Sequence, residues 1–209
     1  MNHPRIAAII PVGSLEVAKS RLGGALDAEE RLDLAERFLS RTLEAALATT
    51  SLDDVVVISP DRDVLHRAAE LGARTLRQRS IGLNAGLDEG RADVVAGGAD
   101  AIVVLPIDLP LLTSGAIEAV LGSIAGDDDS PRVVLVTDRH GSGTNVLALR
   151  PPDVIDFRFG LGSREAHAAA ATAAGARYIE LGGPLAFDLD TPDDLVLFEG
   201  MASEGIGVG

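Results

Sequence analysis

Short runs of apolar residues alternate along this chain with segments whose apolar residues recur at helical spacing. A run that is apolar at nearly every position is typical of a strand covered on both faces, as in a parallel sheet. The expected strands are 6–11, 54–59, 73–76, 101–105, 132–137, 144–149 and 178–181. Strands that alternate with helices predict a mostly parallel α/β sheet whose connections are right-handed.

The segments between these strands predict helices over 27–49, 63–71, a stretch entering near 83 and running to about 97, 114–124, 164–175 and 193–199. Asp27 and Glu30 are spaced as a capping box at the start of the first helix. The last residues, 201–209, are rich in glycine and show no pattern of a helix or a strand. We therefore predict a single domain over 1–200 and a flexible tail over 201–209.

Composition narrows the classes of function. The 209 residues carry a net charge of −14, which does not neutralise the phosphates of a nucleic acid. Only 3% of the residues are aromatic, so few side chains can stack on bases. The absence of cysteine excludes disulfides, thiolate zinc sites and cysteine nucleophiles. No segment reaches the roughly 18 apolar residues of a membrane span, and the N-terminus lacks a signal-peptide pattern. We expect a cytoplasmic protein that binds neither nucleic acid nor membranes.

Lys19 is the single lysine of the chain, and it lies in the loop 11–22 that follows the first expected strand. An ammonium is a compact charge on a flexible stem and suits a phosphate, although a surface lysine retained by chance is the alternative. Ligands of open α/β sheets bind beyond the carboxyl ends of the strands. The loops 11–22, 106–110 and 138–144 all follow strands, which predicts one shared site.

Three aspartates are candidate metal ligands. Asp108 follows a long apolar run, where a carboxylate is costly unless it is paired or bound to a metal. Asp188 and Asp190 are two residues apart, so an extended backbone directs both side chains to one side. Carboxylates of this kind suit Mg²⁺, which takes one or two of them together with substrate phosphates. The alternative is capping, with Asp190 or Thr191 as the N-cap before Pro192.

Two glycine-bearing segments are candidate anion sites. The loop 138–145 combines glycines with hydroxyls and an arginine, and Ser163 follows two glycines at a helix start. An ordinary hairpin loop and a plain N-cap are the alternatives, and His167 by itself suggests a structural histidine. The chain has no Walker A motif, no dinucleotide fingerprint after the first strand and no serine nucleophile elbow.

In this order and spacing, the motifs resemble those of the CofC/FbiD family of guanylyltransferases in coenzyme F420 biosynthesis. The resemblance runs from residue 6 to residue 197 and is carried by the segments 18–22, 82–85, 108–110, 139–145, 159–167 and 188–192. The broader relatives are the MobA-like nucleotidyltransferases. The resemblance implies a single-domain, Rossmann-like (GT-A/MobA-like) three-layer α/β sandwich with a mostly parallel central sheet.

The resemblance also implies an activity: GMP from GTP is joined to a small phosphorylated three-carbon acid, either phosphoenolpyruvate or 2-phospho-L-lactate, and pyrophosphate is released. The residues themselves choose neither the acid nor the base. The implied roles are catalysis for Lys19, Arg21 and Asp108; Mg²⁺ binding for Asp108 with Asp188 or Asp190; acid binding for Thr144, Gly160 and Ser163; and nucleotide binding for Pro11, Val12, Gly13, Lys19 and Asn84. Many relatives carry lysine where this chain has Gly13, which leaves Lys19 and Arg21 to balance the triphosphate.

Two other interpretations stay open from sequence. One is a related nucleotidyltransferase that acts on a molybdopterin or a sugar phosphate, although a pterin favours a more aromatic pocket. The other is a non-catalytic nucleotide-binding protein. The joint presence of Lys19 and the three aspartates favours catalysis. The oligomeric state is open, and a homodimer is compatible with the sequence.

Overall fold

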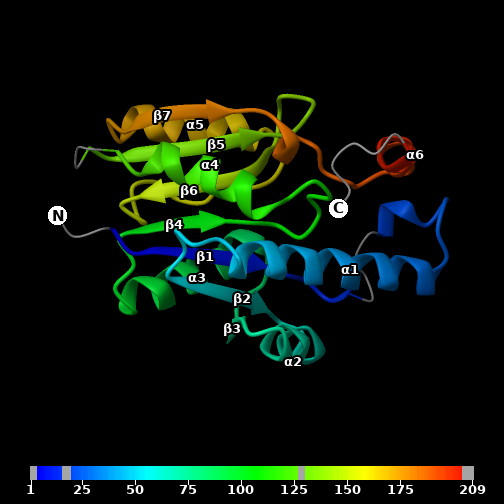
Figure 1. The fold of residues 1–209 in the computed structure, drawn as a ribbon. Coiled ribbons are helices and arrows are strands. Elements are labelled where there is room, and N and C mark those ends of the chain that lie inside the picture. The colour runs from blue at the N-terminus through cyan, green and yellow to red at the C-terminus, as the bar shows by residue number, and fades with distance from the viewer. Residues whose placement is uncertain (1–3, 16–19, 127–129, 204–209) are drawn as a thin grey trace.

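The computed structural model describes residues 4–15, 20–126 and 130–203. A seven-stranded sheet with the order β3-β2-β1-β4-β6-β5-β7 forms the centre of the molecule (Figure 1). The strands are β1 Ile6–Pro11, β2 Asp54–Ser59, β3 Arg74–Arg77, β4 Ala101–Val104, β5 Arg132–Thr137, β6 Thr144–Arg150 and β7 Arg177–Leu181. Only β6 runs antiparallel to its neighbours, so the other strands of this sheet end at the same edge.

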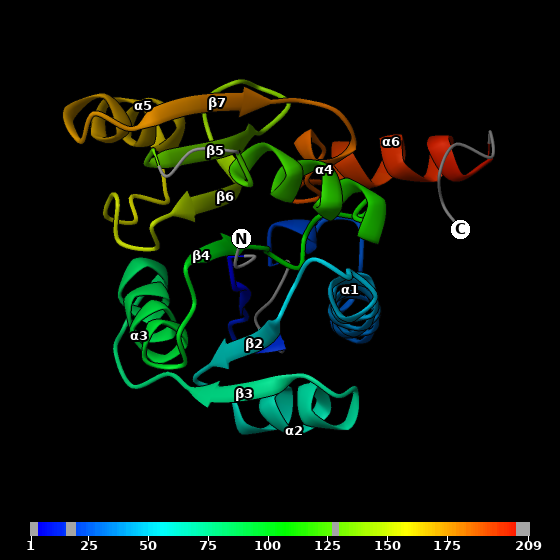
Figure 2. The same cartoon turned by 60° about the vertical axis from the view of Figure 1, so that its left-hand side comes forward.

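Helices cover both faces of the sheet. They are α1 Ala28–Leu47, α2 Arg62–Glu70, α3 Leu83–Ala96, α4 Ser114–Ile124, α5 Ser163–Ala173 and α6 Pro192–Ser203. Figure 2 shows α1, α2 and α4 on one side of the sheet and α3 and α5 on the other. In β1, Ile6, Ala8 and Ile10 pack toward the first side, whereas Ala7 and Ile9 pack toward the second. Both faces are buried, which explains why the strand is apolar at every position.

The predicted elements are all present, and most boundaries agree within two residues. The capping box of α1 is confirmed, because the Asp27 carboxylate accepts from the Glu30 amide and the Glu30 carboxylate accepts from the Asp27 amide. Two short 3-10 helices, Ser20–Leu22 and Pro184–Ala186, were not predicted.

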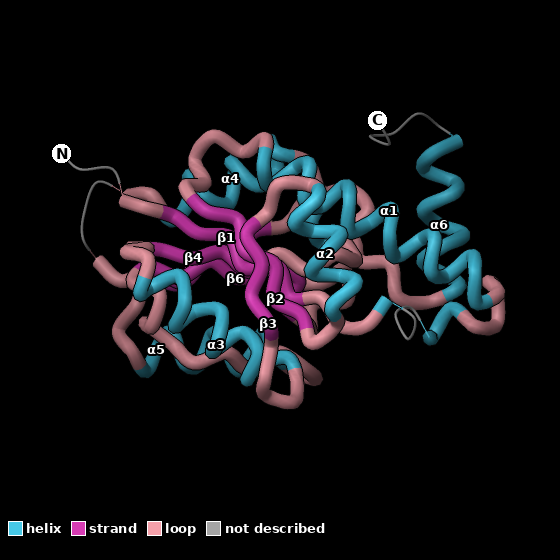
Figure 3. Tube along the Cα trace, turned by 90° about the horizontal axis from the view of Figure 1, so that it is seen from below, coloured by secondary structure: helices cyan, strands magenta, loops and turns pink. Residues whose placement is uncertain are grey.

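The last helix is longer than predicted. It begins at Pro192 but continues to Ser203 instead of ending at 199. Figure 3 shows α6 beside α1 at one end of the sandwich, where Phe198 meets Phe38 edge-on with ring centroids 6.3 Å apart. The prediction of a flexible tail stays a prediction, since residues 204–209 lie outside the described part of the chain.

The packing of α6 also fixes the segment that precedes it. Leu189 is fully buried in a small cluster with Leu22, Leu34 and Phe38. The Leu189 amide donates a 2.9 Å hydrogen bond to the carbonyl oxygen of Asp108. The segment that carries Asp188 and Asp190 is therefore held against the loop that follows β4.

None of the described helices is long and apolar enough to cross a membrane.

Candidate active site

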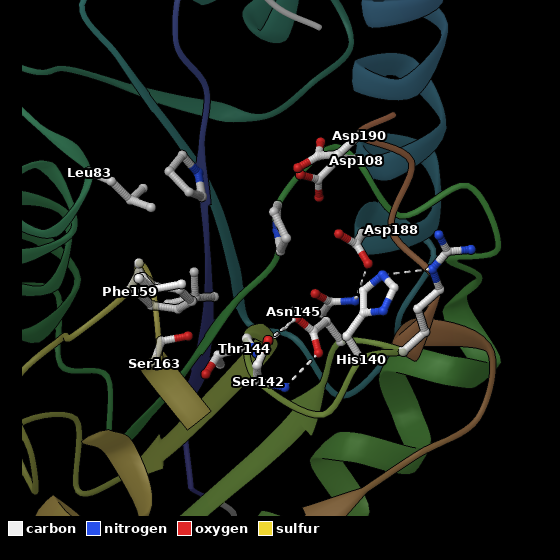
Figure 4. A pocket seen from close by; sticks show the side chains of 18 of the residues that line it. Leu83, Asp108, His140, Ser142, Thr144, Asn145, Phe159, Ser163, Asp188 and Asp190 are labelled. Carbon is white, nitrogen blue, oxygen red and sulfur yellow. Dashed lines mark hydrogen bonds between the residues drawn. The ribbon is translucent and has the colours of Figure 1, made fainter. Parts of the chain in front are cut away.

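A cleft of about 630 Å³ opens at the edge of the sheet where the parallel strands end (Figure 4). Its walls come from the ends of β1 and β4, the turn between β5 and β6, the segment before α5 and the segment before α6. The predicted site residues that line it are Pro11, Arg21, Asp108, Thr144, Gly160, Ser163, Asp188 and Asp190. The structure thus brings most of the predicted site together, whereas Lys19 lies outside the described residues.

The three aspartates lie on one side of this cleft. The backbone bond between Leu189 and Asp108 joins their two segments, and Figure 4 shows the carboxylates of Asp108 and Asp190 near each other. The Arg21 guanidinium is 3.6 Å from the Asp190 carboxylate and is largely exposed. Among the described residues, no group of three or more His, Cys, Asp or Glu side chains is arranged to hold a metal alone. Mg²⁺ is usually bound by one or two carboxylates together with waters and substrate phosphates.

Asp188 has an electrostatic environment of its own. Burial raises the pKa of Asp188, and the nearby charges of Asp190 and Asp138 act in the same direction. Asn145 partly opposes this effect, because its side-chain amide lies 3.5 Å from the Asp188 carboxylate while also donating to the Leu185 carbonyl at 3.0 Å. A partly buried carboxylate among other carboxylates is stabilised in its charged form by a cation.

Asp194 is a functional candidate that the sequence analysis missed. Its buried carboxylate accepts hydrogen bonds from the amides of Asp190 and Thr191, at 3.0 and 2.7 Å, and from the Thr191 hydroxyl at 2.8 Å. It also forms an ion pair with Arg139. Burial opposes the charged form, but the Thr191 donors, the Asp190 amide and Arg139 together hold the pKa of Asp194 below its usual value.

The same contacts resolve the capping question. The Thr191 hydroxyl accepts from the Asp194 amide at 3.3 Å and Pro192 is the first helical residue, so Thr191 is the N-cap of α6. The side chains of Asp188 and Asp190 are not needed for that purpose. Both line the cleft instead.

The glycine loop between β5 and β6 differs from the expected anion site. The amides of Ser142 and Gly143 donate to the carboxylate of Asp138 at 2.9 and 2.8 Å. Burial alone would raise the pKa of Asp138, but these amides hold it below its usual value. A Cβ at Gly143 would lie 2.5 Å from the Asp138 carboxylate, so a larger residue here would force the Asp138 side chain to shift. The loop satisfies these two amides with its own carboxylate, and they are not available to an external anion.

The candidate acid-binding residues lie across the cleft from the aspartates (Figure 4). Thr144 begins β6, and Ser163 is the first residue of α5. Gly160 and Gly162 both have positive φ angles, 134° and 71°, which glycine adopts without strain. The backbone therefore turns sharply before α5, and the positive end of this helix faces the cleft.

The candidate nucleotide-binding residues at the end of β1 have different environments. Pro11 lines the cleft, while Val12 is buried and donates its amide to the Ile58 carbonyl at 2.9 Å. Gly13 is exposed, and a Cβ there would meet nothing within 4 Å, so the backbone leaves room for a side chain at this position.

Asn84 lies at the start of α3, and its side-chain amide forms two hydrogen bonds with the backbone of Phe159. It donates to the carbonyl at 3.0 Å and accepts from the amide at 2.9 Å. In this structure Asn84 holds the segment before α5. Its predicted contact with a nucleotide stays a prediction.

Comparisons with known proteins agree with this geometry. A family model described as "Guanylyl transferase CofC like" matches residues 6–202. Phosphoenolpyruvate guanylyltransferase of Rubrobacter xylanophilus is 44% identical over 202 residues, 96% of each chain. The enzyme of the same name from Sphaerobacter thermophilus is 41% identical over 200 residues, which cover 95% of this chain and 94% of that one.

Solved structures support the fold. CMP:2-keto-3-deoxy-manno-octonic acid synthetase complexed with CTP superposes with a TM-score of 0.64 at 16% identity, covering 96% of this chain and 99% of that one. The 4-diphosphocytidyl-2C-methyl-D-erythritol synthase of Anaerococcus prevotii gives 0.66 at 9% identity, covering 96% of each chain. The predicted three-layer nucleotidyltransferase fold is therefore confirmed.

Proposed function

Because the chain belongs to the family of CofC-like guanylyl transferases and is itself a guanylyltransferase, we propose that it joins GMP from GTP to phosphoenolpyruvate and releases pyrophosphate. The observation that carries this choice of acid is the identity of 41 to 44%, over nearly the full length, with enzymes of that name. The cleft supports it, since hydroxyls and a helix N-terminus lie on one side and carboxylates lie on the other.

In the proposed reaction, a phosphate oxygen of the acid attacks the α-phosphorus of GTP. The bond from the α-phosphorus to the oxygen that bridges the α- and β-phosphates breaks, and pyrophosphate leaves with that electron pair. The nucleophile is already an anion, so no general base is required. Arg21 lies at the rim and is placed to stabilise the leaving pyrophosphate, together with Lys19 as predicted from sequence.

We further propose that Asp108, with Asp188 or Asp190, binds Mg²⁺. The donor set fits this ion, because carboxylate oxygens from two adjoining segments face the cleft and leave coordination positions for phosphates. A bound Mg²⁺ would reduce the repulsion between the two anionic substrates. Burial and the neighbouring carboxylates destabilise the ionised form of Asp188, and a bound cation would stabilise that form.

The acid 2-phospho-L-lactate is the second candidate, because it carries the same phosphate and carboxylate and differs in planarity at one carbon. The larger acceptors, molybdopterin and sugar phosphates, find less support. Phe159 is the single Phe, Tyr or Trp among the described residues that line the cleft. A role in coenzyme F420 biosynthesis follows from the proposed reaction. Cytoplasmic location, a homodimer and the absence of nucleic-acid partners remain predictions.

The test is pyrophosphate release from GTP and Mg²⁺, with phosphoenolpyruvate and 2-phospho-L-lactate assayed in parallel. We expect release with phosphoenolpyruvate, and none when CTP or ATP replaces GTP. Release with 2-phospho-L-lactate alone would replace the proposed acid. No release with either acid, in protein shown to bind GTP, would reject this substrate class.

A separate prediction concerns the Asp188→Asn variant. An acid whose pKa is higher in the folded than in the unfolded protein stabilises the fold below its unfolded pKa, and this stabilisation is lost as the pH rises through the folded value. Asp188 is therefore expected to destabilise the metal-free protein at neutral pH. Removing its charge should raise the Tm at pH 7 without metal by a few degrees and reduce the rise in Tm that Mg²⁺ causes in the presence of GTP.

Thermal unfolding of both proteins, with and without Mg²⁺ and at pH 4 and pH 7, measures these effects. The gain in Tm should shrink at pH 4, because the raised pKa of Asp188 favours its neutral form more strongly as the pH falls. An unchanged response to Mg²⁺ would argue against metal binding at Asp188.

A further inference from the structure

We propose that His167 is a positioning residue that directs the hydroxyl hydrogen of Thr144 into the cleft, where Thr144 donates it to the acid substrate. This inference rests on the proposed function, and it explains how one wall of the cleft recognises the anionic acid. His167 lies in α5, is completely buried and does not line the cleft. It can therefore act only through a neighbour.

The hydrogen bonds of His167 determine its tautomer. Its Nε2 lies 2.9 Å from the backbone amide of Arg158, and an amide N–H can only donate. Nε2 must therefore accept, which means that it carries no proton. In a neutral imidazole the proton is then on Nδ1.

The ring remains neutral under ordinary conditions. Burial lowers the pKa of His167 to about 4, and the charge of Arg158 acts in the same direction. Phe159 packs edge-on against the imidazole at 5.2 Å between ring centroids, which also fixes the plane of the ring. A single tautomer in a single orientation is the result.

The consequence falls on Thr144. His167 Nδ1 lies 3.0 Å from the Thr144 hydroxyl oxygen, and because Nδ1 carries the proton, the oxygen must accept. A hydroxyl has one hydrogen, which is then left for another partner. Within the described residues, this hydroxyl has no other hydrogen bond in the structure, and Thr144 lines the cleft near Ser163 (Figure 4).

This arrangement favours an anion at that point of the cleft. A hydroxyl whose hydrogen is directed into the cleft pairs well with a carboxylate or phosphate oxygen, which only accepts when ionised, and a hydrogen bond to a charged acceptor is stronger than one to a neutral acceptor. The buried histidine thus contributes to recognition of the acid although it touches no substrate.

Two substitutions separate the hydrogen bonds of His167. The shorter side chain of His167→Asn can place an amide N–H near the position of Nδ1 and restore the donor to Thr144. The longer His167→Gln reaches the position of Nε2 and retains the acceptor for Arg158, but it leaves Thr144 without its donor. Each is made in the parent protein and in Thr144→Val, which keeps the shape of threonine without the hydroxyl.

We expect His167→Gln to raise the KM for phosphoenolpyruvate by about tenfold, with the KM for GTP changed far less. His167→Asn should recover most of that loss. In the Thr144→Val background, His167→Gln should cause no additional rise in the acid KM, because the hydroxyl through which His167 acts is gone. An equal rise in both backgrounds would mean that His167 acts only by packing, and would overturn the proposal.

A second measurement does not depend on activity. The ¹⁵N shifts of the His167 ring in the intact protein distinguish a protonated from an unprotonated nitrogen. We expect a protonated Nδ1 and an unprotonated Nε2 at pH 7, and the opposite tautomer would overturn the proposal even if the enzyme is active. If neither acid supports pyrophosphate release, the proposed function fails, while the tautomer still tests whether His167 directs the Thr144 hydroxyl.

Discussion

Replacing Asp108 by asparagine is expected to lower kcat/KM by about a thousandfold while leaving the fold intact. The carboxylate lies just beyond β4, at the edge of the cleft, and asparagine has nearly the same shape without the charge. The backbone carbonyl of residue 108 still accepts from the Leu189 amide in the variant, so the two segments remain joined. What is lost is the negative charge proposed to bind Mg²⁺.

Steady-state kinetics at increasing Mg²⁺ concentrations measure the effect, and a thermal unfolding curve checks the fold. Asp88→Asn is the matched control, because Asp88 is an exposed aspartate on α3 that pairs with Arg91 and does not line the cleft. It should retain full activity. Turnover close to the parent level in Asp108→Asn would contradict the metal assignment.

Much of the fold could be predicted because the local signals and the tertiary structure agree. The strands at 6–11 and 54–59 are buried on both faces, so their apolar runs are unambiguous. The capping box at Asp27 is likewise a purely local contact. Such agreement between levels makes a sequence easy to interpret.

The predicted end of α6 at 199 was wrong, since the helix continues through Gly200 to Ser203 although glycine is a poor helix former. Phe198 and Leu195 pack on Leu34 and Phe38 of α1, far away in the sequence. Propensity is a weak guide where tertiary contacts decide a helix boundary.

The candidate site shows the same division. Asp108 could be placed at the site because the ends of parallel strands share an edge, whereas its meeting with Asp188 and Asp190 was implied by the family resemblance. The contact between Asn84 and Phe159 could not be predicted, because no motif in the sequence links the start of α3 with the segment before α5. The use of the Ser142 and Gly143 amides by Asp138 was missed for another reason, since a glycine loop that binds an external anion has the same composition.

The ion pair between Asp194 and Arg139 connects the start of α6 with the loop after β5, and its loss has the second large expected effect. Asp194 belongs to α6 and binds the backbone of Asp190 and Thr191, whereas Arg139 belongs to the loop after β5. Removing a buried charge leaves its partner uncompensated, and here it also removes bonds at a helix start. We expect Asp194→Ala to lower the free energy of unfolding by about 3 kcal/mol.

Activity should fall as well, by at least about tenfold at saturating GTP, because the segment that carries Asp188 and Asp190 loses the carboxylate that holds its backbone. Denaturant unfolding and steady-state kinetics measure the two effects. The control is Asp193→Ala, which removes the same charge from the same helical turn at an exposed position. If both variants unfold alike, the loss of a negative charge near the helix start suffices as an explanation, and the buried pair does not hold the cleft together. A stability loss confined to Asp194→Ala, with a smaller further loss when Arg139→Ala is added, would assign the effect to the pair itself.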